Sequence, residues 1–296
     1  MTLEQLRIFV AVAEREHLTQ GARTLNLTQS AVSSAIATLE TRYATRLFDR
    51  IGRRIVLTEA GRLFLTEARA VLARAAAAEA VLSDLSGLVR GSLALMASQT
   101  VANYWLPPLI QRFRREHPGI AVALAIGNSE TVTAAIHGGV ADLGFIEGEI
   151  EDPSLAMTAV AEDELVIVVP ADHPWTRNAP STEELKQGAW ILREPGSGTR
   201  AMFEAALPGL GLGAADLGVA LELPSNEAIC AAVAAGAGAT AISRLVAANA
   251  IAAGRLAIVA LPLPKRRFLA LRHKERYLAR AAAAFLTLAQ SGPGSA

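Results

Sequence analysis

The spacing of apolar positions near the N-terminus predicts two short helices. Thr19 can cap a first helix that keeps Ala22 and Leu25 on one side, and the Asn26-Leu27 step ends it. Thr28 can cap a second helix. The apolar positions of this second helix recur at helical spacing and form its inward side: Ala31, Val32, Ala35, Ile36 and Leu39.

The opposite side of the second helix is polar and is expected to point outward. Its side chains are amides and hydroxyls: Gln29, Ser30, Ser33, Ser34 and Thr38. Such a face fits the DNA major groove, where Gln29 can pair with adenine and the serines can meet a base edge or a phosphate. The backbone N–H groups after Thr28 are natural phosphate donors. An ordinary solvated helix would show the same pattern, so these helices alone do not decide the function.

A basic hairpin is predicted after the two helices. Residues 55–57 (Ile-Val-Leu) have a strand pattern, and Gly52 allows a turn before them. Three arginines at the tip could reach the DNA backbone or the minor groove. The hairpin therefore favours a winged DNA-binding domain over residues 1–58. The predicted DNA contacts are Thr28, Gln29, Ser30, Ser33, Ser34, Thr38, Arg50, Arg53 and Arg54.

The first ninety residues resemble the winged helix-turn-helix and linker helix of bacterial LysR-type transcriptional regulators. One departure is Tyr43-Ala44, where the family usually has Leu-Gly before the wing. The resemblance implies a sequence-specific DNA-binding regulator. The matching positions are Leu3, Leu6, Phe9, Ala13, Ala22, Leu25, Gln29, Val32, Ser33, Ile36, Leu39, Glu40, Leu47, Phe48, Arg50, Leu57, Thr58 and Gly61.

Residues 59–90 are predicted to form a long linker helix with a seven-residue apolar repeat. The repeat alternates steps of three and four, which is the pattern of a coiled-coil seam. Two chains paired there would present two recognition helices to DNA. The alternative is a helix packed against its own domain. The predicted dimerisation residues are Phe64, Ala68, Val71, Ala75, Ala78, Leu82 and Leu85.

From Ser92 onward, strand patterns alternate with helix patterns, which predicts parallel sheets. One predicted helix spans residues 101–116, with a kink at Pro107-Pro108. The chain is expected to build two α/β lobes, lobe I from residues 91–161 and 265–290 and lobe II from 162–264. The fold class is thus α/β, with a helix-rich winged N-terminal domain. Residues 91–296 resemble the effector domain of the LysR-type family and periplasmic solute-binding proteins.

Two strand-to-helix junctions, residues 98–100 and 194–200, are expected to face the cleft between the lobes. Ligands of α/β sheets lie at the carboxyl ends of strands, where helix N-termini favour anions. Glu147 should lie nearby and would repel a bare anion, so it could pair with Arg200, accept from a ligand donor, or be a surface residue. The hydroxyls could also be ordinary caps. The predicted effector-binding residues are Ser98, Thr100, Glu147, Ser197, Gly198 and Thr199.

Residues 147–148, 194–200 and 241–244 resemble the branch of the family that regulates carbon-fixation or sulfur-assimilation genes. This resemblance implies a small anionic effector, such as a sulfur oxyanion or a phosphorylated metabolite. We expect no cofactor and no metal.

The amino-acid composition restricts which functions the chain can have. The 28 basic and 28 acidic residues cancel, so DNA affinity must come from local arrangement rather than from a whole-molecule field. The single cysteine, Cys230, excludes a disulfide framework and is expected to be a buried apolar residue rather than a reactive thiol. Neither a secretory signal nor a membrane span is evident, which predicts a cytoplasmic protein.

Three functions remain in competition. A ligand-responsive regulator would bind inverted-repeat DNA as a homodimer or dimer of dimers, with RNA polymerase as a further partner and no membrane. An enzyme would use the cleft, but no nucleophile-base pair is evident, and His117, His137 and His173 are scattered. A constitutive DNA-binding or DNA-packaging protein is disfavoured by the neutral charge and the cleft.

Overall fold

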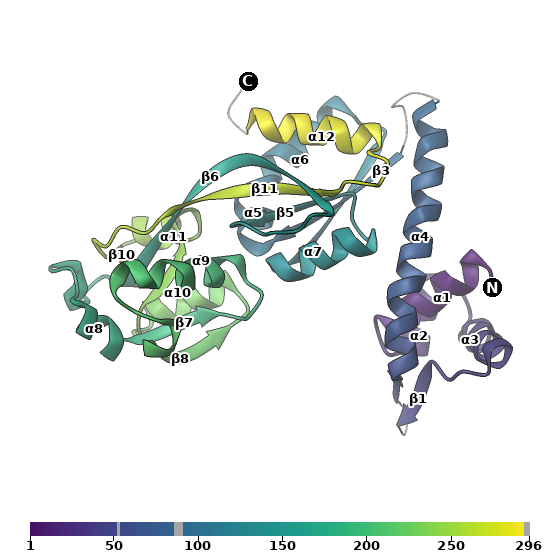
Figure 1. The fold of residues 1–296 in the computed structure, drawn as a ribbon, viewed down its shortest axis with the longest axis horizontal. Coiled ribbons are helices and arrows are strands. Elements are labelled where there is room, and N and C mark those ends of the chain that lie inside the picture. The colour runs from purple at the N-terminus through teal and green to yellow at the C-terminus, as the bar shows by residue number, and fades with distance from the viewer. Residues whose placement is uncertain (52–53, 86–90, 293–296) are drawn as a thin grey trace. The chain divides into compact units, whose positions relative to one another are not determined.

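The computed structural model describes residues 1–51, 54–85 and 91–292, which form two units (Figure 1). The first unit is built from residues 1–85, and the second from the chain that follows. Each unit has its own hydrophobic core, as expected for a chain of this length.

The first two helices of the N-terminal unit begin at side-chain caps. Helix α1 (Leu3–Ala13) starts at Thr2, whose hydroxyl accepts from the Gln5 N–H. Helix α2 (Leu18–Thr24) starts at His17, whose Nδ1 accepts from the Gln20 N–H. The predicted helix is confirmed, but the predicted Thr19 cap is wrong, because the helix begins earlier and places Thr19 inside its first turn.

Helix α3 (Gln29–Tyr43) begins where the sequence predicts. The Thr28 hydroxyl accepts from the Ala31 N–H at 3.2 Å, so this cap is confirmed. The expected inward side is largely confirmed, with three buried members, Val32, Ile36 and Leu39. Ala35 is half-buried, and Ala31 is exposed and therefore does not belong to that side.

The predicted wing is a two-stranded antiparallel hairpin of β1 (Phe48–Ile51) and β2 (Arg54–Leu57), with Phe48 opposite Leu57. A Glu40 carboxylate oxygen accepts from the N–H groups of Leu47 and Phe48, at 2.7 and 3.1 Å. This buried end of the hairpin is therefore held directly by helix α3. Gly52, Arg53 and the side chain of Arg54 lie outside the described residues.

Helix α4 (Glu59–Leu85) is the long linker helix. Its first turns pack on helix α1, because the Phe64 ring lies 4.8 Å from the Phe9 ring and Ala68 is only 1% exposed. An ion pair of 2.8 Å between Arg69 and Glu14 adds to this contact. This half of the helix belongs to the core of its own domain.

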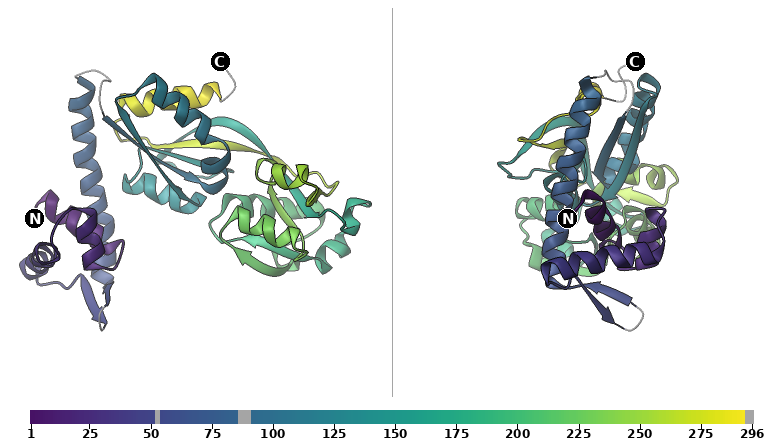
Figure 2. Two further views of the ribbon diagram at one scale, coloured as in Figure 1. Left: turned by 180° about the vertical axis from the view of Figure 1, so that it is seen from behind. Right: turned by 90° about the vertical axis from the view of Figure 1, so that its right-hand side faces the viewer.

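The second unit is organised around a mixed sheet in the order β10-β6-β11-β5-β3-β4, with β9 paired to β6. Strand β3 is parallel to its neighbours β4 and β5, as predicted. Strands β6 and β11 cross between the lobes near the predicted lobe boundaries (Figures 1 and 2). They pair antiparallel to each other, which the sequence did not predict. A smaller sheet pairs β7 and β8 in parallel. The bounds are β3 (Gly91–Ser98), β4 (Ile120–Gly127), β5 (Leu143–Glu147), β6 (Leu155–Pro170), β7 (Ala189–Arg193), β8 (Gly218–Leu223), β9 (Thr240–Ser243), β10 (Leu256–Ile258) and β11 (Lys265–His273).

The helices of the second unit cover these sheets. The single kinked helix predicted over residues 101–116 is wrong, because two helices meet at Trp105. Pro107 and Pro108 lie in the first turn of the second helix, where a backbone N–H is not needed. The bounds are α5 (Gln99–Tyr104), α6 (Leu106–Glu116), α7 (Ser129–Gly138), α8 (Thr182–Gln187), α9 (Gly198–Ala206), α10 (Asn226–Ala234), α11 (Arg244–Ala252) and α12 (Arg280–Ser291).

Each lobe of the second unit has an aromatic core. In the first lobe Phe145 and Phe285 pack edge to face, with ring centroids 5.9 Å apart. In the second lobe Trp190 lies 5.0 Å from Phe203, and its indole N–H donates to the Leu185 carbonyl. Strand β6 runs from one core to the other, across the boundary that the sequence places at residue 162. The two rigid cores are thus joined by continuous strands, which position the cleft.

Candidate functional site

The outward face of helix α3 consists of small polar side chains that are satisfied locally. Ser30, Ser34 and Thr38 are all exposed. The Thr38 hydroxyl donates to the Ser34 carbonyl at 2.8 Å, and the Thr28 and Ser30 hydroxyls lie 3.0 Å apart. Such short-range bonds exchange easily for a bond to another partner.

Gln29 and Ser33 flank this face instead of lying at its centre. Gln29 is exposed, and its side-chain oxygen accepts from the Thr19 hydroxyl at 3.1 Å. Ser33 is half-buried and lines a small hollow together with Arg50 of the wing. Thr41, exposed two turns beyond Ser34 and on the same face, was missed by the sequence analysis, although the same helical spacing includes it.

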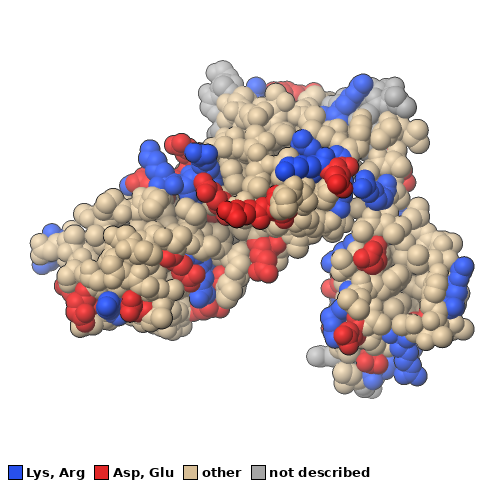
Figure 3. Space-filling view, viewed as in Figure 1, with Lys and Arg blue, Asp and Glu red and all other residues tan. Residues whose placement is uncertain are grey.

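The N-terminal segment is locally basic although the whole chain is neutral. The first 62 residues contain nine arginines and no lysine, against six carboxylates. Arg50 is exposed on the wing. Figure 3 shows basic and acidic side chains interspersed over the visible faces, without one continuous basic field. DNA affinity based on a few placed arginines agrees with this distribution.

The structure divides the predicted dimerisation residues into two groups. Phe64 and Ala68 face the core of their own unit, so their expected place in a pairing seam is wrong. Val71 and Leu82 are exposed, by 42% and 69%. Ala75 is half-buried, Ala78 is exposed, and the side chain of Leu85 lies outside the described residues.

The exposed apolar surface of helix α4 also includes residues outside the predicted seam. Leu63 is 69% exposed and Val81 36% exposed, on the side opposite Ala68. Isolated exposed apolar residues are common, but several on one helix favour a partner surface. Only the first part of the predicted seam, at Phe64 and Ala68, packs within its own unit, because sequence periodicity cannot distinguish a helix side that packs within its own domain from one that packs on another chain.

In the second unit, three predicted effector residues meet at one buried point. The Glu147 carboxylate, at the end of β5, is only 2% exposed. One of its oxygens accepts from the Ser98 hydroxyl, and the other accepts from the Thr199 hydroxyl at 3.1 Å. Ser98 ends β3 and Thr199 lies in the first turn of α9, so the carboxylate joins the two lobes.

A buried arginine completes this cluster. The Arg266 guanidinium donates to the Thr199 hydroxyl at 3.0 Å and to Asp163 at 2.7 Å, and lies 4.0 Å from Glu147. Ser243 donates to the same aspartate. One terminal nitrogen of Arg266 lies 2.7 Å from Asp163 without making a hydrogen bond of acceptable geometry. The cluster therefore contains a buried donor with no aligned acceptor among the described residues.

Arg266 was missed by the sequence analysis, and so was its partner Asp163. Arg266 lies in β11, 103 positions from Asp163 and 67 from Thr199, so no local spacing connects them. One signal was available. The two-residue period of a strand places Arg266 on the same side as the buried Phe268.

A second buried network lies beside the first. Thr100 accepts from the Asn226 side-chain amide at 3.2 Å, and Asn226 in turn accepts from Arg193 at 2.7 Å. Arg193 also donates to both oxygens of Glu194, and hydrogen bonds from Arg193 hold the pKa of that carboxyl below its usual value despite its burial. Glu194 accepts as well from Asn128 of the first lobe. The predicted junctions at 98–100 and 194–200 thus both face the same inter-lobe region.

The remaining predicted residues shape a cavity of about 470 Å³ beside Glu147. Ser197 caps α9, and Gly198 packs so closely on the Glu147 carbonyl and the Ser129 hydroxyl that a Cβ would lie 2.5 Å from each. The buried Ser129 hydroxyl has no hydrogen-bond partner among the described residues. Two further carboxylates, Glu130 and Glu149, line the cavity.

The structure excludes two of the three alternatives expected for Glu147. It is not a surface residue, and its pairing with Arg200 is wrong. Arg200 binds Glu204 and Glu222 instead, at 2.7 and 2.6 Å, because its side chain extends from α9 toward β8.

Comparison with known families agrees with this architecture. Residues 3–62 match the family described as "Bacterial regulatory helix-turn-helix protein, lysR family", and residues 86–293 match the "LysR substrate binding domain". The chain belongs to the LysR family. Proteins of this family are DNA-binding transcriptional regulators with an effector-binding domain, and the fold class expected from the sequence is confirmed.

Several members of the LysR family are similar over most of the chain. An uncharacterized HTH-type transcriptional regulator of Escherichia coli (strain K12), YeiE, is 37% identical and covers 97% of this chain and 96% of its own length. A RuBisCO operon transcriptional regulator of Acidithiobacillus ferrooxidans is 35% identical, covering 87% and 82%. The expected resemblance to carbon-fixation regulators is therefore confirmed.

A solved structure matches the effector domain of this LysR-family chain. It is the regulatory domain of Synechocystis PCC6803 CcmR in complex with 2-PG, 27% identical, with a TM-score of 0.62. It covers 68% of this chain and 97% of its own. Within the residues that the structure describes, the helices are too short or too polar to cross a bilayer.

Proposed function

We propose that this LysR-family regulator is switched by a small oxyanion metabolite, which binds where the Glu147 carboxylate now lies. The observation that supports this proposal is the environment of that carboxylate. Two hydroxyl donors, Ser98 and Thr199, converge on it from opposite lobes, beside a buried arginine. A sulfur oxyanion or a phosphorylated metabolite presents the same kind of acceptor atoms.

The donors of this site exceed what Glu147 can satisfy. A terminal nitrogen of Arg266 and the hydroxyl of Ser129 are both buried without an aligned partner. A buried unsatisfied donor costs about 1–3 kcal/mol, and an acceptor brought by a ligand would recover this energy. An oxyanion with three or more oxygens can reach more donors than a carboxylate.

The acidic lining of the adjacent cavity restricts how an oxyanion can bind. Glu130 and Glu149 would repel an anion that entered while Glu147 stayed in place. The oxyanion must therefore displace the Glu147 side chain. That exchange would alter the contact between β5 and α9 and favour one arrangement of the lobes, provided that the ligand binds that arrangement more tightly.

Two relatives support this class of ligand. The regulatory domain of CcmR has been solved with 2-PG, and another relative regulates a RuBisCO operon. The first shows a small molecule bound to a domain of this fold, and the second links a similar chain to carbon fixation.

The full-length chain can be tested by thermal shift and calorimetry. The panel contains sulfate, sulfite and small phosphorylated acids, with ammonium compounds of equal size as controls. Because it removes a competing charge and keeps the shape, Glu147→Gln should raise oxyanion affinity by about tenfold or more. The double variant Ser98→Ala with Thr199→Val should abolish binding. If ammonium compounds bind instead, and binding is weakened by Glu147→Gln, the ligand is cationic and the proposal is wrong.

On the DNA side, we propose that α3 enters the major groove and that the wing contacts the flanking backbone. The exposed hydroxyl face and the local excess of arginine support this arrangement. We infer that Arg50, Arg53 and Arg54 bind phosphates, so Arg50→Ala should weaken all DNA sites alike and lower the salt dependence of binding. An unchanged salt dependence would remove Arg50 from the interface.

We further propose a homodimer or dimer of dimers that pairs through helix α4 and binds an inverted-repeat site. The exposed residues Leu63, Val71, Val81 and Leu82 support this assignment. Leu63→Glu with Leu82→Glu should yield a monomer in analytical ultracentrifugation, whereas Glu67→Gln should not. A double variant that stays dimeric would place the interface elsewhere.

We propose a cytoplasmic regulator, with RNA polymerase as a further partner, and not an enzyme. The Ser98 and Thr199 hydroxyls donate to carboxylates and not to a histidine base, so neither is activated as a nucleophile. Turnover of a bound ligand that Thr199→Val abolishes would contradict this view.

A further inference from the structure

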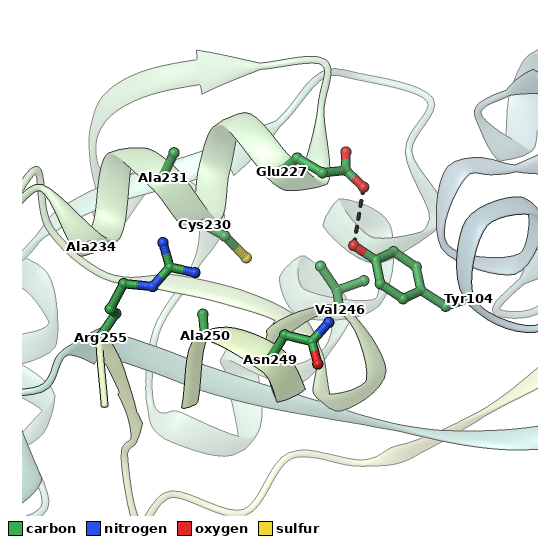
Figure 4. Close-up of a pocket in the computed structure, with 9 residues that line it drawn as sticks. All are labelled: Tyr104, Glu227, Cys230, Ala231, Ala234, Val246, Asn249, Ala250 and Arg255. Carbon is green, nitrogen blue, oxygen red and sulfur yellow. Dashed lines mark hydrogen bonds between the residues drawn. The ribbon is translucent and has the colours of Figure 1, made fainter. Parts of the chain in front are cut away.

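A second cavity, of about 200 Å³, lies in the other lobe between helices α10 and α11. Its walls are small and apolar, and polar groups occupy its ends (Figure 4). Tyr104 of α5 closes one end, and Arg255, which follows α11, lies at the other. The cavity therefore touches helices from both lobes. The apolar lining consists of Ala231, Ala234, Val246 and Ala250.

The acidic end of this cavity is already saturated with donors. Glu227 accepts from the Tyr104 hydroxyl at 3.1 Å, from the Asn103 amide at 3.3 Å and from the Ser225 hydroxyl at 3.0 Å. These donors, together with the backbone, lower the pKa of Glu227 although burial opposes them. Glu227 therefore has little remaining capacity to bind a cation.

The basic end carries two exposed polar side chains. Within the described part of the chain, the side chains of Arg255 and Asn249 have no hydrogen-bond or ion-pair partner, and both extend toward the cavity (Figure 4). By contrast the exposed Arg244, at the start of α11, binds Glu164 at 2.5 Å. Arg255 is thus a positive charge at the edge of an apolar wall, and an anion in the cavity could bind it without displacing another protein group.

We infer that this cavity is a second ligand site, specific for a small monocarboxylate with an apolar body. The carboxylate would bind Arg255 and Asn249, and the body would lie against the apolar wall. An engineered cavity of about 150 Å³ in another protein holds benzene, so the volume here suits a ring or branched chain of about six carbons. The recognition is charge-assisted at one end and hydrophobic at the other.

The position of this site couples it to the inter-lobe networks. Tyr104 lies in the same helix as Thr100, and Glu227 follows Asn226 directly. The Tyr104–Glu227 and Thr100–Asn226 hydrogen bonds therefore join the same two helices. A ligand that changes the packing of α5 on α10 would change the inter-lobe region as well, and the coupling would act equally in both directions.

Cys230 can report ligand binding in this cavity, because it is the only cysteine in the chain and its sulfur lines the cavity. Burial, together with the nearby Glu227, raises the pKa of the thiol to about 11. Its reaction with a neutral alkylating reagent will be slow, and a bound ligand will slow it further.

The experiment measures alkylation of Cys230 by iodoacetamide at pH 9 in the full-length protein, with increasing cyclohexanecarboxylate. We expect saturable protection of at least about fivefold. The neutral isostere cyclohexanecarboxamide should not protect at the same concentration. Arg255→Gln should weaken protection by about tenfold or more, since a charged hydrogen bond is lost. The matched variant Arg244→Gln should behave as the wild type.

A second measurement separates binding from thiol chemistry. Saturation-transfer NMR with cyclohexanecarboxylate should give a signal in wild type and in Cys230→Ala, but not in Arg255→Gln. Equal protection by the carboxamide, or binding that survives Arg255→Gln, would show an apolar hollow without anion recognition. Absence of binding at millimolar concentrations in both measurements would also overturn the inference. Neither measurement contains a sulfur oxyanion or a phosphorylated acid, so a failure of the proposed site at Glu147 would not by itself produce a negative result here.

Discussion

The two candidate sites use the same residue types in opposite environments. On helix α3, Ser30, Ser34 and Thr38 are exposed, and the Thr38 hydroxyl bonds within its own helix. In the second unit, Ser98, Thr100 and Thr199 are at most 2% exposed and bind side chains from distant parts of the chain. The first surface can change partners at little cost, whereas each bond of the second must be replaced by an equivalent one.

This difference indicates how each site works. An exposed hydroxyl face gains affinity contact by contact, which suits recognition of DNA sequences that differ by single bases. A buried polar cluster accepts only a ligand that satisfies all its donors at once, which suits a switch with two states. Four predictions test this comparison, in order of decreasing effect.

Removal of the buried arginine should have the largest effect. Arg266→Ala leaves Asp163 and Glu147 buried without their cation and should lower the free energy of unfolding by about 3–5 kcal/mol. Urea denaturation of the full-length chain measures this loss. Arg200→Ala removes a partly exposed arginine from two ion pairs and should cost at most about 1 kcal/mol. Equal losses in the two variants would contradict the proposed distinction between buried and exposed networks.

Removal of the Gln29 amide, which we propose to face the major groove, should affect DNA binding but not stability. Gln29→Ala should reduce discrimination at one base pair by about 1–3 kcal/mol. Its free energy of unfolding should change by no more than about 0.5 kcal/mol, because the side chain is exposed. Binding to sites selected from a random DNA pool gives the first quantity, and Gln187→Ala in the other unit is the control. An unchanged base preference would exclude Gln29 from the groove.

The departure from the family at Ala44 should carry a measurable strain. Ala44 ends α3 in the left-handed region, with φ of 47°. Glycine adopts this conformation freely, so Ala44→Gly should raise the free energy of unfolding by about 1 kcal/mol. Ala37→Gly, an exposed position inside the same helix, should lower it by a similar amount. If both variants lose stability in thermal denaturation, Ala44 is not strained.

The smallest effect concerns acid stability. Hydrogen bonds from the Ser154 hydroxyl and the His137 ring lower the pKa of Asp152 to about 2. A carboxyl with a lowered pKa stabilises the fold above its unfolded pKa, near 4, and this contribution is lost as the pH falls toward 2. Asp152→Asn should therefore lose less stability than the wild type between pH 5 and pH 3. Parallel stability curves for the two proteins would contradict this assignment.

The sequence predicted the structure of the helix α3 region better than the contacts of the buried cluster. The cap at Thr28, the inward side of α3 and the strand at residues 55–57 were predicted correctly, because each depends on neighbours within about one helical turn or one hairpin. For Glu147 the sequence left three alternatives open, of which pairing with Arg200 and a surface position are wrong, and Arg266 was missed. Both depend on which strands become neighbours, and β11 pairs with β5 although the two strands lie far apart in the sequence.

Helix α4 shows in the same way that sequence predicts local structure better than distant contacts. The sequence determined that this helix is long and amphipathic, that a polar helix with a wing precedes it, and that strand-to-helix junctions with hydroxyl side chains follow. Only the tertiary structure decided that Phe64 and Ala68 pack inward and that Ser98, Glu147 and Thr199 meet around a buried arginine. Local periodicity and capping are set by bonds between near neighbours, whereas burial and charge pairing depend on contacts that close across a hundred residues.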